Sequence, residues 1–191
     1  MSAEGFGELV LILGDLHIPH RASAIPAPLK KMLVPDRMQH VLCTGNACTK
    51  SVLEYLKTIA PNVHAVKGDF DEIDGLVEER VVQIGQFKIG LCHGHTVVPW
   101  GDLDSLSVVR RKLDVDILVT GHTHKNQVIE HDGAYFINPG SITGAFDGIN
   151  SRVTPSFILM SIKKSKVTVY VYELPPGAKK PTVAKTEFTK K

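Results

Sequence analysis

Short apolar runs alternate with segments of helical periodicity through the first two thirds of the chain. The apolar runs are four to six residues long and rich in Val, Ile and Leu, which predicts buried strands. In Lys50–Ala60 apolar residues recur every three or four positions, which predicts a helix with one buried face. This alternation favours an α/β fold. The expected strands are 8–13, 40–44, 63–66, 80–84, 87–92 and 116–120, and the expected helices are 28–33, 50–60 and 103–113.

From Gln127 onward the helical period disappears and strand-like runs follow one another at 128–131, 134–137, 157–162 and 167–172. Short turns between them predict an antiparallel meander. The segment Pro175–Pro181 cannot continue a strand, because proline lacks the N–H that a ladder needs. We therefore expect one domain over residues 1–174. The remaining residues, 175–191, form a turn followed by either an edge strand at Thr182–Phe188 or a frayed basic tail.

Composition narrows the class of protein. Hydrophobic residues make up 43% and charged residues 22%, a balance typical of folded globular domains. We expect no secretory signal and no direct membrane insertion, because no apolar run approaches the roughly 20 residues that span a bilayer. The odd number of cysteines, 3, fits a reducing cytosol. A net charge of only +2 argues against a nucleic-acid partner.

Metal-ligand residue types stand directly after the predicted strands. In α/β sheets the ligand crevice lies outside the carboxyl ends of the strands, so these residues should converge. Carboxylate, imidazole and amide groups without a thiolate suit manganese, iron or zinc. Each residue alone is more simply a turn residue, but five strand ends together predict a metal site. The candidate ligands are Asp15, His17, Asn46, Asp69, His93, His122 and His124.

Other histidines and one cysteine leave alternatives open. In His93-Gly94-His95 an extended backbone sends the two imidazoles to opposite sides, so we choose His93 as the ligand and expect His95 just behind it. His20 and Cys48 lie near the same loops, where ligation is the minor interpretation. The three histidines in or beside strands, for which packed or solvated side chains are expected, are His40, His64 and His131.

Five motifs in this order resemble the calcineurin-like metallophosphoesterases: Asp-x-His, Gly-Asn, Gly-Asp-x-Asp, Gly-His-Thr-His and Asn-Pro-Gly-Ser. Longer strings, such as Gly14–Arg21 and Pro99–Asp102, resemble the family of small retromer subunits within that superfamily. The resemblance implies a four-layer α/β/β/α sandwich of two mixed sheets. It also implies a cargo-coat role on the cytosolic face of endosome membranes, with the protein cytoplasmic and peripherally bound.

The same resemblance implies two ion positions. One divalent metal, manganese or zinc, would be held by Asp15, His17, Asn46 and His124, and the other by Asn46, Asp69, His93 and His122. Active relatives place Asp where Asn46 stands, so the bridge here is neutral. Two divalent ions about 4 Å apart repel by roughly 16 kcal/mol at a dielectric of 20, and a neutral bridge offsets less of that. Double occupancy should therefore be weak.

A second departure concerns proton transfer. Many phosphatase relatives carry His where Phe70 stands, and Phe has no proton to give to a leaving group. Small phosphodiesterase relatives do without that His. We therefore expect a non-catalytic scaffold, with a divalent-metal-dependent phosphodiesterase or phosphatase as the alternative.

Apolar residues beside the expected crevice suggest a protein partner. Val98 and Trp100 follow the ligand loop, and Trp100 is either a roof over the core or an exposed anchor. The resemblance implies docking on the helical-solenoid vacuolar protein sorting 35 subunit and, through it, on vacuolar protein sorting 26. It also implies that regulators of small GTPases dock on a far patch around Leu159 and Tyr170, whose alternative interpretation is ordinary sheet packing.

Overall fold

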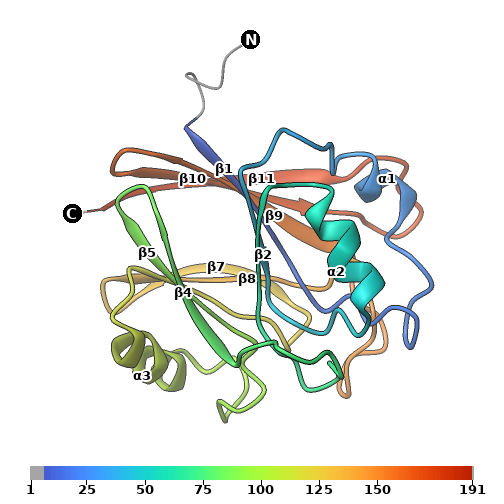
Figure 1. Ribbon diagram of the computed structural model, residues 1–191, viewed down its shortest axis with the longest axis horizontal. Helices are drawn as coiled ribbons and strands as arrows, with labels where there is room; N and C mark the ends of the chain where they lie inside the picture. The colour runs from blue at the N-terminus through green and yellow to red at the C-terminus, as the bar shows by residue number, and fades with distance from the viewer. Residues whose placement is uncertain (1–6, 191) are drawn as a thin grey trace.

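Two mixed β-sheets packed face to face form the centre of the protein, in a computed structural model that describes residues 7–190 (Figure 1). Residues 1–6 of the expected domain (1–174) and residue 191 of the expected C-terminal segment (175–191) lie outside the described part of the chain. The first sheet has the order β11-β10-β9-β1-β2-β3. Its strands are β1 (Glu8–Leu13), β2 (His40–Cys43), β3 (Asn62–Ala65), β9 (Ser156–Lys163), β10 (Lys166–Glu173) and β11 (Thr182–Thr189).

The second sheet has the order β4-β5-β6-β8-β7. In it β5, β6 and β8 run parallel, as β1, β2 and β3 do in the first sheet, while the outer strands are antiparallel. In each sheet the carboxyl ends of the three parallel strands therefore lie at the same edge. The strands are β4 (Glu79–Ile84), β5 (Phe87–Cys92), β6 (Ile117–Val119), β7 (Asn126–His131) and β8 (Ala134–Pro139).

Helices cover the outer faces of both sheets, which gives the expected four layers (Figure 1). Helices α1 (Ala27–Lys30) and α2 (Lys50–Lys57) pack Leu29 and Leu56 against the first sheet. Helix α3 (Leu103–Leu113) packs Leu106 against the second. Between the sheets lies a core of branched side chains in which residues of both sheets are fully buried, among them Ile12, Leu42, Ile89, Ile117 and Ile158.

The expectation of a single meander after Gln127 is wrong. The hairpin β7–β8 completes the second sheet, whereas β9, β10 and β11 extend the first, beside β1. The two hairpins have similar alternating patterns, so each predicts an antiparallel pair. The pattern carries no information about which sheet receives the pair, because both sheets bury the same kinds of side chain.

Of the two alternatives for the C-terminal segment, the edge strand is correct and the frayed tail is wrong. All eight residues of β11 pair with β10. Phe188 is the buried residue of β11, and its ring stacks on Tyr135 of the second sheet with centroids 3.5 Å apart. One buried position in eight explains why the alternation in the sequence is weak.

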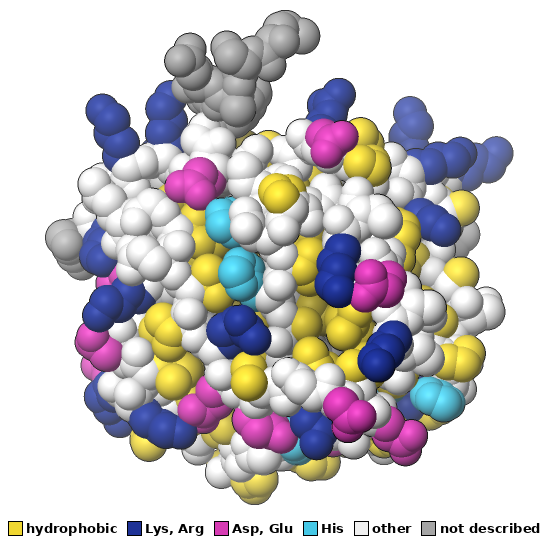
Figure 2. Space-filling model, in the orientation of Figure 1, with side chains coloured by type: hydrophobic (Ala, Val, Ile, Leu, Met, Phe, Trp, Pro, Cys, Tyr) yellow, Lys and Arg dark blue, Asp and Glu magenta, His cyan; other side chains and the backbone are white. Residues whose placement is uncertain are grey.

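Element boundaries differ from the expected ones mainly at the helices, since α1 begins at Ala27 and α2 ends at Lys57. Within residues 7–190 no helix is long and apolar enough to cross a membrane. Positive and negative side chains are interspersed over the face seen in Figure 2. That face offers no single-signed stripe of the kind that follows a nucleic-acid backbone.

Candidate metal centre

The loops after β1, β2, β5 and β6 meet at one edge of the two sheets and are joined by backbone hydrogen bonds. Asp15 N–H donates to Gly45 C=O over 3.0 Å, and Gly121 N–H donates to His93 C=O over 2.9 Å. The side chain of Asp15 accepts from His122 N–H over 2.9 Å, which ties the first sheet to the second. The expected convergence of the strand ends thus occurs, and it draws on both sheets.

Five of the seven candidate ligands have backbone φ angles in the left-handed region, which residues other than Gly rarely adopt: Asp15, His17, Asn46, His122 and His124. Each such residue costs on the order of 1 kcal/mol, and clusters of this strain are typical of functional sites. Gly45, with φ +107°, adds a further constraint. A Cβ there would lie 2.7 Å from Gly68 N and 3.0 Å from His93 Nδ1, so only Gly allows the loops to approach.

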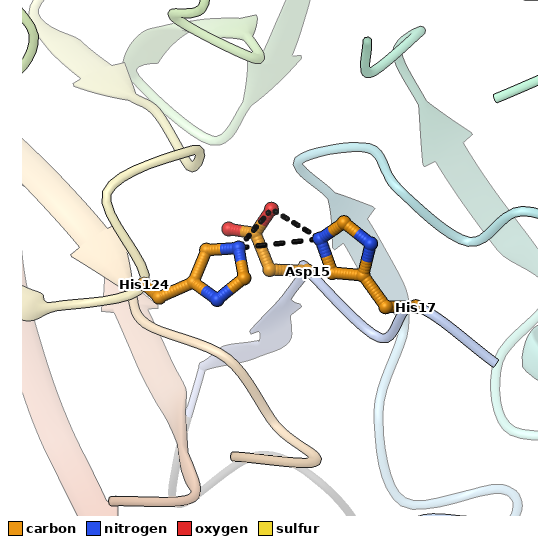
Figure 3. Close-up of side chains that lie close together, drawn as sticks. All are labelled: Asp15, His17 and His124. Atoms are coloured by element: carbon orange, nitrogen blue, oxygen red, sulfur yellow. Dashed lines mark hydrogen bonds and ion pairs between the residues drawn. The ribbon is translucent and has the colours of Figure 1, made fainter. Parts of the chain in front are cut away.

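Asp15, His17 and His124 form the first group of ligand atoms, drawn from the loops after β1 and β6 (Figure 3). The Nε2 atoms of His17 and His124 lie 3.2 Å apart, and Asp15 Oδ1 lies 3.5 Å from that of His124. Nδ1 of His124 is 2.6 Å from Ala145 C=O and donates to it, which turns Nε2 towards the centre. Burial, followed by the charges of Arg21 and His124, lowers the pKa of His17 to about 3, so its imidazole is neutral.

Asp69, His93 and His122 form the second group. His93 Nδ1 donates to Thr44 C=O over 2.7 Å, and its Nε2 lies 3.0 Å from Asp69 Oδ1. Burial opposes ionisation of Asp69, but hydrogen bonds from His122, His93 and Asn46 outweigh it and hold the pKa well below its usual range. Burial also lowers the pKa of His93, yet the Asp69 hydrogen bond and the Asp15 charge raise it more.

Asn46 lies between the two groups. Its Nδ2 is 2.9 Å from Asp69 Oδ1, 3.3 Å from Asp15 Oδ1 and 3.0 Å from His93 Nε2. Each group alone offers one carboxylate and two imidazoles, whose ligand atoms all lie within 4.8 Å of one another. This donor set and spacing fit a divalent ion such as zinc or manganese.

A crevice of about 510 Å³ opens above the two groups. Three exposed apolar side chains line it: Phe70, Trp100 and Ile149. Val98 lies two residues before Trp100. The Arg21 guanidinium contacts both phenylalanines, at 4.3 Å from the Phe70 ring centroid and 5.1 Å from that of Phe146. We call these five residues the apolar rim, with exposed fractions of 46% (Phe70), 72% (Val98), 54% (Trp100), 51% (Phe146) and 80% (Ile149).

Trp100 is exposed rather than a roof over the core, although it is well positioned. Its ring meets that of His122 edge to face at 4.4 Å, and its Nε1 donates to His95 C=O over 3.1 Å. His95 lies behind the group of Asp69, His93 and His122, and its ring centroid is 5.3 Å from that of His93. Burial and the nearby His93 lower the pKa of His95.

The minor ligand candidates lie outside both groups. His20 is exposed, and Cys48 is buried with Sγ 3.7 Å from Asn46 C=O. His40 and His64 stack on each other at 5.7 Å, and His131 contacts Asp104. At the far patch, Leu159 pairs with Tyr170 across β9 and β10, but Tyr172 rather than Tyr170 lines the cavity of about 40 Å³ beside Leu159.

Sequence reasoning assigned no role to several residues that build the centre. Asp71 is buried and accepts N–H hydrogen bonds from Asn46, Cys48 and Gly68. Ser141 Oγ donates to Asp15 C=O over 2.7 Å. Asp71 and Ser141 belong to the motifs Gly-Asp-x-Asp and Asn-Pro-Gly-Ser, and these motifs could have indicated a role for them. Phe146 and Ile149 belong to no motif, so nothing in the sequence indicated theirs.

Comparison with known proteins places this geometry in a family. The calcineurin-like phosphoesterase superfamily domain matches residues 9–165. The vacuolar protein sorting-associated protein 29 (Vps29) of Schizosaccharomyces pombe is 39% identical over 173 residues, which cover 88% of this chain and 92% of that protein. The chain belongs to the Vps29 family.

Solved Vps29 structures have the same fold over nearly their whole length. Vps29 of Cryptosporidium parvum is 48% identical, with a TM-score of 0.92, covering 97% of this chain and 100% of that one. Wild-type Vps29 of Entamoeba histolytica, solved in complex with Zn²⁺, is 50% identical, with a TM-score of 0.89, covering 95% of this chain and 99% of that one. The Vps29 fold of this chain thus includes the strand ends that carry both ligand groups.

Proposed function

We propose that this chain is a non-catalytic scaffold subunit of the retromer cargo-sorting complex, acting in retrograde transport from endosomes to the Golgi. It docks on the helical-solenoid vacuolar protein sorting 35 subunit and, through that subunit, joins vacuolar protein sorting 26. Its place in the cell is the cytoplasm and the surface of endosome membranes. Membership of the Vps29 family supports the role in vacuolar protein sorting.

The apolar rim is the observation that carries the proposal. A substrate phosphate is best recognised by Arg, Lys and amide donors. Here Phe70, Trp100 and Ile149 of the apolar rim line the crevice together with Arg21 and Lys125, and the Arg21 guanidinium lies against the rings of Phe70 and Phe146. Exposed apolar clusters with an aromatic anchor are typical of protein docking sites. The rim therefore fits a partner protein better than a phosphate ester.

The chemistry of the centre supports the same conclusion. The centre would hold a divalent ion, zinc or manganese, through Asp15, His17, Asn46 and His124 or through Asn46, Asp69, His93 and His122. A bound ion would supply Lewis acidity and charge at the floor of the crevice. The residue between the two groups is the neutral Asn46, and Phe70 has no proton to donate at the crevice mouth.

The far patch is a second docking surface in this proposal. Leu159 and Tyr170 are half-buried neighbours on β9 and β10, and Met32, which lines the same small cavity as Leu159, is exposed. Regulators of small GTPases bind there, away from the metal centre. The two surfaces therefore leave the solenoid subunit and a regulator able to bind together.

Co-purification tests the central partner directly. The chain, carrying an affinity tag and produced together with the vacuolar protein sorting 35 subunit, should retain that subunit at a one-to-one ratio through size-exclusion chromatography. Scattering measured on the eluted peak gives the mass of the complex. Elution of the two chains as separate peaks at micromolar concentration contradicts the proposal.

A metal-dependent phosphodiesterase or phosphatase is the second candidate, and the two intact groups of carboxylate and imidazole ligands favour it. We expect negligible hydrolysis of simple phosphomonoesters and phosphodiesters with saturating manganese. A turnover near the typical enzyme value of about 10 per second, abolished in His122→Ala, would establish the enzyme instead. The His122→Ala control separates turnover at this centre from a contaminating hydrolase.

A further inference from the structure

The side-chain amide of Asn46 is held from two sides at once. On one side its Oδ1 accepts a hydrogen bond from Phe70 N–H over 2.9 Å. On the other side its Nδ2 donates to Asp69 Oδ1 over 2.9 Å and faces Asp15 Oδ1 at 3.3 Å. The same Nδ2 lies 3.0 Å from His93 Nε2 and 3.3 Å from His17 Nε2. The NH₂ group thus contacts ligand atoms of both groups.

Hydrogen-bond chemistry determines this orientation of the amide. A backbone N–H such as that of Phe70 only donates, so it requires the amide oxygen opposite it. Ionised carboxylates such as Asp15 and Asp69 only accept, so they require the NH₂ group. Turning the amide over would leave a donor facing a donor at Phe70 and oxygens facing oxygens at the carboxylates. The present orientation satisfies both sides.

Hydrogen bonds and close packing link the loops that carry Asn46 and Phe70. Asp71 accepts from Asn46 N–H over 2.7 Å and from Gly68 N–H over 2.8 Å, which links the two loops through one buried carboxylate. Gly68 is packed so tightly that an added Cβ would clash with Asn46 Oδ1. Phe70, two residues further on, is therefore fixed relative to the amide.

A divalent ion reverses what the centre requires of Asn46. A cation between the carboxylates is attracted to oxygen lone pairs and repelled by N–H groups. The amide has a single oxygen, which faces Phe70 N–H, while its NH₂ group faces the two carboxylates. A carboxylate at this position would have two oxygens, one for Phe70 N–H and one for the ion. In the present orientation Asn46 turns its NH₂ group, and not its oxygen, towards an ion between the carboxylates.

We propose that Asn46 is an amide switch, whose NH₂ group replaces a cation among the ligands and must turn away before a divalent ion binds. Turning releases Phe70 N–H from its acceptor. Phe70 belongs to the apolar rim, and its ring lies against Arg21. Ion binding at the centre therefore changes the hydrogen bonding of a rim residue. This inference rests on the metal binding in the proposed function. It adds that binding of the ion includes the cost of turning the Asn46 amide.

The switch is tested with zinc on three full-length proteins. In Asn46→Asp one carboxylate oxygen can accept from Phe70 N–H while the other binds the ion. The matched control is Asn62→Asp, which adds the same charge at an exposed position of β3. Calorimetry gives the zinc affinity. Amide hydrogen exchange, followed by NMR, reports on Phe70 N–H, and the side-chain NH₂ resonances report on Asn46.

In the wild type and in Asn62→Asp, saturating zinc should raise the exchange rate of the Phe70 amide about tenfold and shift the Asn46 NH₂ resonances. In Asn46→Asp zinc should bind at least about tenfold more tightly, and the Phe70 amide should stay protected. Zinc binding to Asn46→Asp alone overturns the switch, because the amide of the wild type then does not turn away for the ion. Zinc binding to the wild type with Phe70 still protected overturns the switch but not the metal site. Zinc binding to none of the proteins overturns both.

Discussion

At the scale of single residues, Asp71 shows how a side chain that touches no ion can determine the geometry of a metal centre. Its carboxylate, 5% exposed, accepts three backbone N–H groups over 2.7–2.8 Å. Two of these donors, Asn46 and Cys48, have positive φ angles. The hydrogen bonds therefore hold a strained loop in place.

Replacing Asp71 by Ala should lower the free energy of unfolding by about 4 kcal/mol, because buried N–H groups lose charged acceptors. Urea unfolding measures the loss. Asp74→Ala is the matched control, since Asp74 is exposed on the same segment, and it should cost less than about 0.5 kcal/mol. Equal effects of the two substitutions would mean that Asp71 does not hold the loops.

The candidate ligands could be predicted from the sequence, because a strand end followed by Asp, Asn or His is a local pattern. The roles of Asp71 and Ser141 were harder to predict, since Asp71 accepts from Asn46 N–H and Ser141 donates to Asp15 C=O, backbone groups more than 20 residues away. Phe146 and Ile149 were missed for a related reason. Their loop reaches the crevice only because β8 and β9 lie in different sheets.

At the scale of elements, neighbouring strands β2 and β3 bring two histidines into contact. His40 and His64 stack with ring planes 20° apart, and His64 Nε2 is buried without a hydrogen-bond partner. Burial, followed by the charges of His40 and of Arg80 on β4, lowers the pKa of His64. Glu8 of β1 contacts His40 at 3.2 Å rather than His64.

This lowered pKa predicts a loss of stability in acid. The unfolded chain takes up a proton on His64 near pH 6.5, while the folded protein resists it. The stabilising contribution is therefore complete above about pH 6.5 and declines below it. His64→Phe keeps an aromatic ring without the titration, so its free energy of unfolding should fall less between pH 7.5 and 5.5. Urea unfolding at each pH measures the difference, and parallel curves for the two proteins would refute this role of His64.

The strands themselves were largely predictable, because each buried run is bounded by Gly, Pro or polar turns. The distribution of the hairpins between the sheets was not, since β7–β8 and β9–β10 have the same alternation but opposite destinations. The choice depends on which open edge, that of β6 or that of β1, each hairpin can reach. That is a property of the assembled fold.

At the scale of the whole molecule, the two sheets supply the two halves of one surface. The first sheet carries Asp15, Asn46 and Asp69, and the second carries His93 and His122. The apolar rim stands around them, from Phe70 after the first sheet to Trp100 after the second. We propose that the metal ligands shape this surface and that the apolar rim supplies the binding energy for the partner.

The most direct test of this account is co-purification of Val98→Asp with the vacuolar protein sorting 35 subunit. Burying an apolar side chain is worth roughly 1.5–3 kcal/mol, and an unpaired carboxylate adds a desolvation cost of several kcal/mol. Val108→Asp is the matched control, because Val108 on α3 is 59% exposed and does not belong to the apolar rim. Circular dichroism melts verify that each variant is folded.

We predict that Val98→Asp abolishes binding, that Val108→Asp retains it, and that Asp69→Ala in the metal centre has a smaller effect than Val98→Asp. The opposite result, in which Val98→Asp co-purifies normally and Asp69→Ala does not, would mean that the metal centre rather than the apolar rim makes the interface.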